Sequence, residues 1–159
     1  MKTRKSWREK IDGAKPAKVV AIPPKMRRMY SSLPKNAKIL IPHPSDVEAL
    51  IRKVPRGKLV SQTELRGKLA RDASADMACP ITTGIFVRIV AEAAEEELRA
   101  GKSKVAPYWR VVRDDGRLIE KLPGGPSGLA EHLAEEGHQI DESGKIRVKN
   151  IEKSLMRYR

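Results

Sequence analysis

The 159-residue sequence has a single cysteine, Cys79, and few aromatic residues: one Phe, two Trp and three Tyr. One cysteine excludes an intramolecular disulfide and an all-cysteine metal site. No apolar run approaches the roughly 18 to 20 residues that cross a bilayer, so we expect no membrane association. The charged start of the chain has no apolar stretch behind it. We therefore expect no secretory signal. We also expect no cofactor, and a cytoplasmic protein that is associated with the nucleoid if its source is bacterial.

Acidic residues are scarce at both ends of the chain. Residues 1–40 hold 12 Lys/Arg and 2 Asp/Glu, residues 41–140 hold 15 of each, and residues 141–159 hold 6 and 3. The net charge of +13 therefore lies in the ends, around a neutral body. Cations that neutralise phosphates release counterions, so a nucleic acid is a natural partner for such ends. Basic tails also occur simply as solubilising arms.

Composition and periodicity predict a mainly α fold with a small β content, in three parts. Residues 1–40 are rich in Lys, Arg and Pro without sustained periodicity, and are expected to form a basic, partly disordered arm. Residues 41–140 are expected to form one domain. Residues 141–159 are expected to add a C-terminal hairpin and a short basic helix over Ile151–Tyr158.

Apolar spacing predicts four helices and a hairpin in the central part. Ser61 and Glu64 fit a capping box at the start of the second helix. In the third helix, Ile85, Ile89 and Ala93 belong to an apolar stripe that should face inward. Asp114-Asp-Gly116 is typical of a hairpin turn. The expected helices are 47–54, 61–70, 83–99 and 126–136, and the expected hairpin strands are 108–112 and 117–119.

Several short motifs follow one another in the order found in a known family. Together they are similar to the DNA-binding domain of 6-O-alkylguanine-DNA alkyltransferases, also called methylated-DNA–protein-cysteine methyltransferases. The resemblance implies a winged helix-turn-helix over residues 41–140, with 83–99 as the recognition helix. The motifs are Val54-Pro-Arg-Gly-Lys58, Ser61-Gln-Thr-Glu-Leu65, Pro107-Tyr-Trp-Arg-Val-Val112, Asp114-Asp-Gly-Arg-Leu118, Gly124-Gly125 and Leu133-Ala-Glu-Glu-Gly137.

The chain departs from the family at its catalytic residues. The nucleophilic cysteine is replaced by Tyr108 and its histidine neighbour by Trp109. A phenol with a pKa near 10 is a poor alkyl acceptor at neutral pH, and an indole can only donate a hydrogen bond. Glu136 matches the acidic residue that would orient the histidine. The chain thus resembles the alkyltransferase-like branch, which lacks the cysteine, binds alkylated guanine and passes the lesion to nucleotide excision repair.

The resemblance also implies a set of DNA-contacting residues. Arg88 matches an arginine that enters the duplex where the flipped base was, and Gln62 stands where the family has a nucleotide-rotating tyrosine. A helix start can bind phosphate through its backbone N–H groups. The expected DNA contacts are Arg88, Ser61, Gln62, Thr63, Lys58 and Arg113, with Arg56 and Arg117 as further phosphate contacts.

Tyr108 and Trp109 are expected to line the base pocket, because aromatic rings stack on flipped bases. Arg110 matches a motif arginine with a structural role. The expected partner is double-stranded DNA, with or without alkylated guanine, bound by a monomer.

Three other interpretations stay open. The chain could be a plain winged-helix DNA binder whose pocket is filled and which has no lesion preference. It could be an enzyme that repairs alkylated DNA through Cys79, which precedes the third helix. It could also be an RNA-associated or protein-adaptor module that retains only the scaffold.

Overall fold

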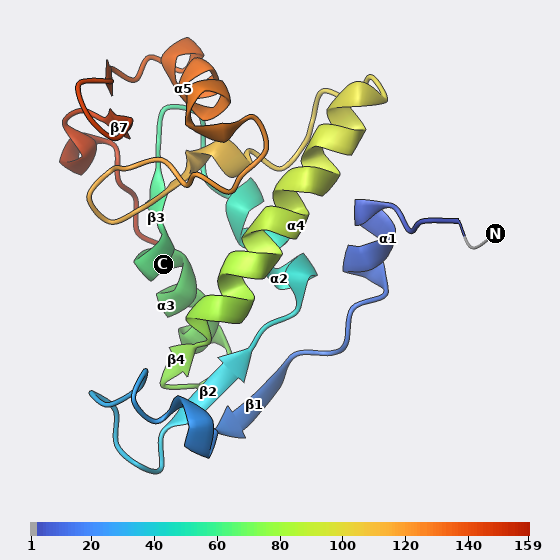
Figure 1. Ribbon diagram of the computed structural model, residues 1–159, viewed down its shortest axis with the longest axis vertical. Helices are drawn as coiled ribbons and strands as arrows, with labels where there is room; N and C mark the ends of the chain where they lie inside the picture. Colours follow the sequence, from blue (N-terminus) through green and yellow to red (C-terminus); the bar gives the residue numbers. More distant parts are fainter. Residues whose placement is uncertain (1–2) are drawn as a thin grey trace.

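The computed structural model describes residues 3–159 as a mixed α/β protein with five helices and three small sheets in that range (Figure 1). The helices are α1 (Trp7–Asp12), α2 (Pro44–Arg52), α3 (Gln62–Asp72), α4 (Pro80–Arg99) and α5 (Gly125–Glu135). The strands are β1 (Lys18–Ala21), β2 (Lys38–Ile41), β3 (Val60–Ser61), β4 (Met77–Ala78), β5 (Val111–Val112), β6 (Ile140–Asp141) and β7 (Arg147–Val148). The short 3-10 turns are η1 (Pro24–Met26), η2 (Tyr108–Arg110) and η3 (Ile151–Lys153).

Helix α4 runs through the middle of the molecule and packs against α1, α2 and η2 (Figure 1). Its buried side includes Val87, Val90, Ala91 and Ala94, which follow the i, i+3, i+4, i+7 spacing of one helix face. The expected stripe was wrong at Ile85, which is 53% exposed. Apolar residues occur on two overlapping faces of this helix, and the smaller side chains are the ones that face the core.

The expected basic arm is folded over the range that the structure describes. Helix α1 starts with a capping box between Ser6 and Glu9, and its Ile11 is buried in the main core. The Arg8 guanidinium binds Glu48 at 2.6 Å and Glu97 at 2.7 Å. These long-range contacts, which a composition argument does not detect, offset the cost of ordering the segment.

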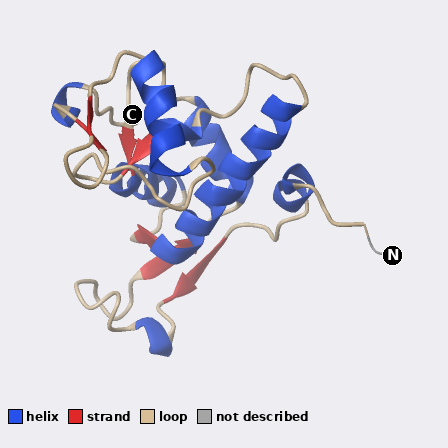
Figure 2. Cartoon of the chain, turned by 45° about the horizontal axis from the view of Figure 1, so that its top comes forward, coloured by secondary structure: helices blue, strands red, loops and turns tan. Residues whose placement is uncertain are grey.

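A three-stranded sheet lies at the N-terminal end of α4, below the helices (Figure 2). Strand β2 pairs antiparallel with β1 and parallel with β4. A second, smaller core fills this region, formed by the buried residues Ile22, Tyr30, Ala37, Ile39 and Cys79. The sheet and this core join the N-terminal segment to the start of α4.

The hairpin expected over 108–119 is only partly present. The turn exists, because Gly116 has a φ of +89° and donates its N–H to Arg113 O at 2.9 Å. Strand β5 instead pairs in parallel with β3, and no strand forms over 117–119. The Leu118 N–H donates to Ile146 O at 3.1 Å, so the returning segment is bound by the C-terminal hairpin.

The C-terminal hairpin is confirmed as β6 and β7, which pair antiparallel. The helix expected over Ile151–Tyr158 is wrong beyond its first turn, η3. The tail continues beside Leu59, whose N–H donates to Ser154 O at 2.9 Å and whose carbonyl accepts from the Met156 N–H at 2.8 Å. This backbone pairing competes with helix formation. No helix in residues 3–159 is long and apolar enough to span a bilayer.

Candidate nucleic-acid interface

A cavity of about 500 Å³ opens between α3, α4 and the segment that leads into α5. It brings together three of the predicted DNA-contact residues, Gln62, Arg88 and Arg113, from three separate elements. The lining residues are Gln62, Ile81, Gly84, Ile85, Val87, Arg88, Arg113, Ile119, Lys121 and Leu122. The lining contains three cations and no carboxylate, and the rest of it is mostly apolar.

The outward face of the first half of α4 forms one wall of this cavity. Ile81 is 50% exposed and Ile85 is 53% exposed, and both are among the few large apolar side chains exposed to solvent in residues 3–159. Ile85 lies three residues and Ile81 seven residues before Arg88, so the three side chains share one face of the helix. Sequence reasoning missed this face because it placed Ile85 in the core.

Arg88 is held only weakly by its neighbours. Its side chain is 55% exposed, and its Nε lies 4.0 Å from Glu92 Oε1 one turn further along α4. An exposed i,i+4 ion pair contributes about 0.3–0.5 kcal/mol. The guanidinium can therefore leave Glu92 for another partner at little cost.

The start of α3 is already occupied by acceptors from the protein itself. Ser61 Oγ accepts from the Glu64 N–H at 3.0 Å, which confirms Ser61 as the N-cap. The expected capping box is only half formed, because the Glu64 carboxylate accepts from the Tyr158 N–H at 3.0 Å and not from the Ser61 N–H. Thr63 Oγ1 donates to Asp114 Oδ2 at 2.6 Å, and the Thr63 N–H points to Asp114 Oδ1 at 3.4 Å. A phosphate at this helix start would have to displace the Asp114 carboxylate.

A shallower hollow of about 270 Å³ continues from the cavity past the start of α3. It is lined by Gln62, Thr63, Arg66, Arg113, Asp114, Asp115 and Arg117. Arg113 lines both spaces, so the cavity and the hollow form one continuous surface with arginines in both parts. Neither hollow includes Lys58, which is exposed, or Arg56, whose guanidinium donates to Glu135 O at 2.8 Å.

Of the two expected base-pocket residues, Tyr108 is buried in the main core and Trp109 is half-buried against that core. Tyr108 is 1% exposed and donates its hydroxyl hydrogen to Glu95 of α4. Burial and then this carboxylate raise the pKa of the Tyr108 phenol, which keeps it neutral. The Trp109 ring stacks on His132 with centroids 4.1 Å apart. Tyr108 thus lies beside α4, as the resemblance requires, but neither ring lines the cavity.

Glu136 has a structural role in this cluster. Its carboxylate accepts hydrogen bonds from Arg110 at 2.7 and 2.9 Å and from the Trp109 indole at 3.1 Å. Burial opposes its ionisation, but the hydrogen bonds from Arg110 and Trp109 outweigh burial and lower the pKa of Glu136. Arg110 also donates to Val54 O at 2.6 Å, which confirms the structural role expected for it. The end of α5 is thereby tied to η2 and to the end of α2.

Cys79 is the N-cap of α4 and is buried in the smaller core. Burial raises the pKa of its thiol, but hydrogen bonds, first among them that from Thr82 Oγ1 at 3.3 Å, outweigh burial and lower it. The thiol does not line the cavity. Within residues 3–159, no group of three His, Cys, Asp or Glu side chains is arranged to hold a metal ion.

Two solved structures of an alkyltransferase-like protein share this fold. One is S. pombe Atl1 in complex with damaged DNA containing O6-carboxymethylguanine, at 18% sequence identity and a TM-score of 0.50. The other is S. pombe ATL in complex with DNA, at 16% identity and a TM-score of 0.51. Each comparison covers 72% of this chain and 94% of the other. No family profile matches the chain, and no curated protein matches it in sequence. The resemblance to the alkyltransferase-like proteins is therefore confirmed at the level of the fold.

Proposed function

We propose that this chain is a non-catalytic DNA-binding protein of alkyltransferase-like type, which accepts an extruded alkylated guanine in the cavity beside α4. The observation that carries the proposal is the convergence of Gln62, Arg88 and Arg113 on one cavity with an exposed apolar wall. The fold supports it, because the S. pombe proteins that share it were solved with DNA, one of them with damaged DNA.

In this proposal α3 and α4 form the helix pair of a winged helix-turn-helix, and α4 docks in the minor groove. Proteins that bind this groove insert apolar side chains between base steps and use arginine beside them. Ile81 and Ile85 supply the apolar contact, and Arg88 fills the gap that the extruded base leaves. Arg113 and Arg66 bind phosphates on the same side, because both line the hollow next to the cavity.

The cavity suits a nucleobase in size and in chemistry. Its volume of about 500 Å³ falls within the roughly 300–1,000 Å³ of small-ligand sites. Ile119 and Leu122 offer apolar contact to an alkyl group, and the Gln62 amide can both donate and accept hydrogen bonds to a base edge.

The proposal excludes alkyl transfer for chemical reasons. The residue at the nucleophile position, Tyr108, is a buried phenol whose pKa is raised further by Glu95. The thiol of Cys79 lies in a separate core and does not reach the cavity lining. In this account the chain binds as a monomer and leaves removal of the lesion to other proteins, those of nucleotide excision repair.

Binding to matched duplexes tests the proposal. Fluorescence anisotropy at fixed salt should show tighter binding to a duplex with one 6-O-methylguanine than to the same duplex with guanine. Arg88→Ala should remove most of the difference. Arg99→Ala is the matched control, because Arg99 is an exposed arginine about three turns further along the same helix. After incubation with the methylated duplex, mass spectrometry should find no added methyl group, and one on Cys79 would establish an enzyme.

A second candidate is a DNA binder without lesion preference. It is favoured by the packing of Tyr108 and Trp109, which fills the place of the family's active site, and by Gln62 at the family's tyrosine position. Equal affinity for the two duplexes would establish this candidate and eliminate lesion recognition. Absence of binding to either duplex would refute both.

A further inference from the structure

We infer that residues 18–41, here called the basic lobe, are a second DNA-contacting surface that binds backbone phosphates of the duplex beside the segment held at the cavity. The inference rests on the proposed function, because it assigns the lobe the same duplex. The lobe contains β1, η1 and β2 and extends beyond the N-terminal end of α4 (Figure 1).

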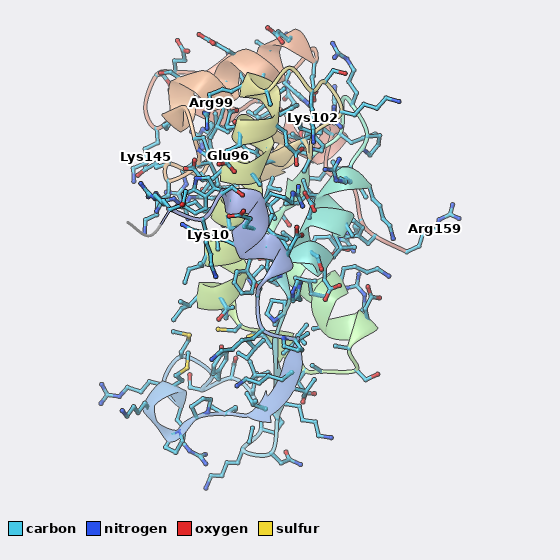
Figure 3. All side chains as sticks on the ribbon, turned by 90° about the vertical axis from the view of Figure 1, so that its right-hand side faces the viewer. Lys10, Glu96, Arg99, Lys102, Lys145 and Arg159 are labelled. Carbon is cyan, nitrogen blue, oxygen red and sulfur yellow. The ribbon has the colours of Figure 1, made fainter. Side chains whose placement is uncertain are left out.

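Every charged side chain of the lobe is a cation. It contains no Asp or Glu, and its basic residues are all exposed. None of them forms an ion pair with another residue of the described range, 3–159. Nitrogen-tipped side chains project outward from the lobe in several directions (Figure 3). The basic residues are Lys18, Lys25, Arg27, Arg28, Lys35 and Lys38.

One cation of α1 shows the alternative that the lobe does not adopt. Arg8 is held by two carboxylates, Glu48 and Glu97, and so serves the fold. The Asp76 carboxylate binds the lobe through the Lys38 backbone N–H at 2.7 Å and offsets at most one of its six charges. The exposed cations therefore repel one another in the absence of a counterion, and a row of phosphates would relieve that repulsion. The charge pattern therefore indicates an anionic partner and not a structural role.

The lobe is a preformed surface. Strands β1 and β2 pair over four residues each, and Tyr30 and Ile39 lie in a core of their own. Burial raises the pKa of the Tyr30 phenol to about 12, so it adds no negative charge to the lobe. A ligand that binds here does not have to order the chain first, which lowers the entropic cost of binding.

The lobe is continuous with the DNA-binding side of α3 and α4. The Cys79 N–H, at the N-cap of α4, donates to Leu40 O at 2.9 Å, and the Asp76 N–H donates to Lys38 O at 2.8 Å. Helix α3, which carries Arg66 of the hollow beside the cavity, packs against β2 of the lobe and against β4. The basic surface thus runs from Arg113 through Arg66 to the lobe.

The distance along α4 predicts how far from the lesion the lobe acts. Arg88 lies eight residues after Pro80, which corresponds to ~12 Å along the helix axis and to ~4 steps of a DNA strand. The lobe begins where α4 begins and extends beyond it, so its phosphates lie at least ~4 base pairs from the extruded base. A short duplex would not reach it.

A comparison of duplex lengths tests the inference. The test variant is Lys25→Gln/Arg27→Gln/Arg28→Gln. The control variant removes the same charge at the opposite end of α4, as Arg99→Gln/Lys102→Gln/Lys104→Gln, where all three side chains are exposed. Urea unfolding should give both the wild-type midpoint. Affinity and its salt dependence are then measured on duplexes of ~7 and ~24 base pairs, each with a central 6-O-methylguanine, so that the short duplex ends ~3 base pairs from the lesion on either side.

We expect the lobe variant to bind the long duplex ~10- to 100-fold more weakly than wild type, with a log–log salt slope smaller by ~2 to 3. On the short duplex it should match wild type, and the control variant should match wild type on both. Wild-type affinity of the lobe variant on the long duplex would overturn the inference, as would an equal loss on both duplexes or an equal loss in the control. A wild-type protein that binds neither duplex would instead refute the proposed function itself.

Discussion

Two regions involve helix α4: its outward face, and the cluster around Tyr108 that packs on it. Their polar groups differ in how many hydrogen-bond and ion-pair partners they have within the protein. At the outward face, Arg88 has only a 4.0 Å ion pair, and Ile81 and Ile85 contact solvent. In the cluster, the Tyr108 hydroxyl, the Trp109 indole and the Arg110 guanidinium each donate to a carboxylate, that of Glu95 or that of Glu136.

This contrast separates binding from stability. A buried polar group without a partner is costly, so the satisfied cluster has nothing left to offer a ligand without losing free energy of folding. An exposed apolar side chain beside a weakly paired cation stabilises the fold little, and it gains free energy when a partner covers it. The variants below are ordered from the largest expected effect to the smallest, and each tests one side of this comparison.

Glu136→Ala should give the largest effect, on stability. It leaves the Arg110 guanidinium, whose side chain is 13% exposed, without its carboxylate. Removing one partner of a buried ion pair costs about 3–5 kcal/mol of unfolding free energy. Urea unfolding measures the loss, with exposed Glu135→Ala as the control. A loss below about 1 kcal/mol would show that the cluster does not hold the fold together.

Arg88→Ala should affect binding and not stability. Loss of the side chain that fills the gap in the base stack should weaken binding to the methylated duplex by about 1–3 kcal/mol. The unfolding free energy should stay within about 0.5 kcal/mol of wild type, because the side chain is exposed. If the loss of unfolding free energy exceeded the loss of binding free energy, Arg88 would be a residue that stabilises the fold and not one that binds DNA.

Tyr108→Phe should lower stability without changing lesion preference. The change leaves the Glu95 carboxylate without the donor that it has in the interior, at a cost of about 1–2 kcal/mol. The ratio of affinities for methylated and unmethylated duplex should equal that of wild type. A tenfold change in this ratio would show that Tyr108 faces the bound base.

Ile85→Ala should give the smallest effect. For a side chain exposed to solvent, the unfolding free energy should change by less than about 0.5 kcal/mol. If Ile85 were in the core, the same change would cost about 2–5 kcal/mol. DNA affinity should fall a few fold, since the apolar contact with the groove is lost. Thermal unfolding and anisotropy on the same preparation distinguish these outcomes.

Features set by neighbouring residues were predictable from the sequence. Ser61 caps α3 three residues before Glu64, and the turn at 142–146 joins β6 to β7, because both involve contacts over a few positions. The folding of the arm was not predictable, since it depends on Arg8 binding Glu48 and Glu97, 40 and 89 positions away. The parallel pairing of β3 with β5 is equally non-local.

The candidate site was predictable where its residues belong to, or lie beside, short sequence motifs, and not where a distant segment sets the path of the chain. The motif order identified Gln62, Arg88 and Arg113, which the structure brings to one cavity. Lys121 and Leu122 were missed because the segment 117–122 takes its path from the C-terminal hairpin, through the hydrogen bond between Leu118 and Ile146. The inward packing of Tyr108 depends on a carboxylate of α4 that no motif in the sequence marks.

The central claim is that the cavity beside α4, and not the cluster around Tyr108, receives the extruded base. Photo-crosslinking tests it most directly, with a duplex whose guanine carries a photoreactive alkyl group on O6 and with mass spectrometry of the crosslinked peptides. The account predicts crosslinks in residues 81–88 and 119–122. Crosslinks confined to 107–110 would contradict it.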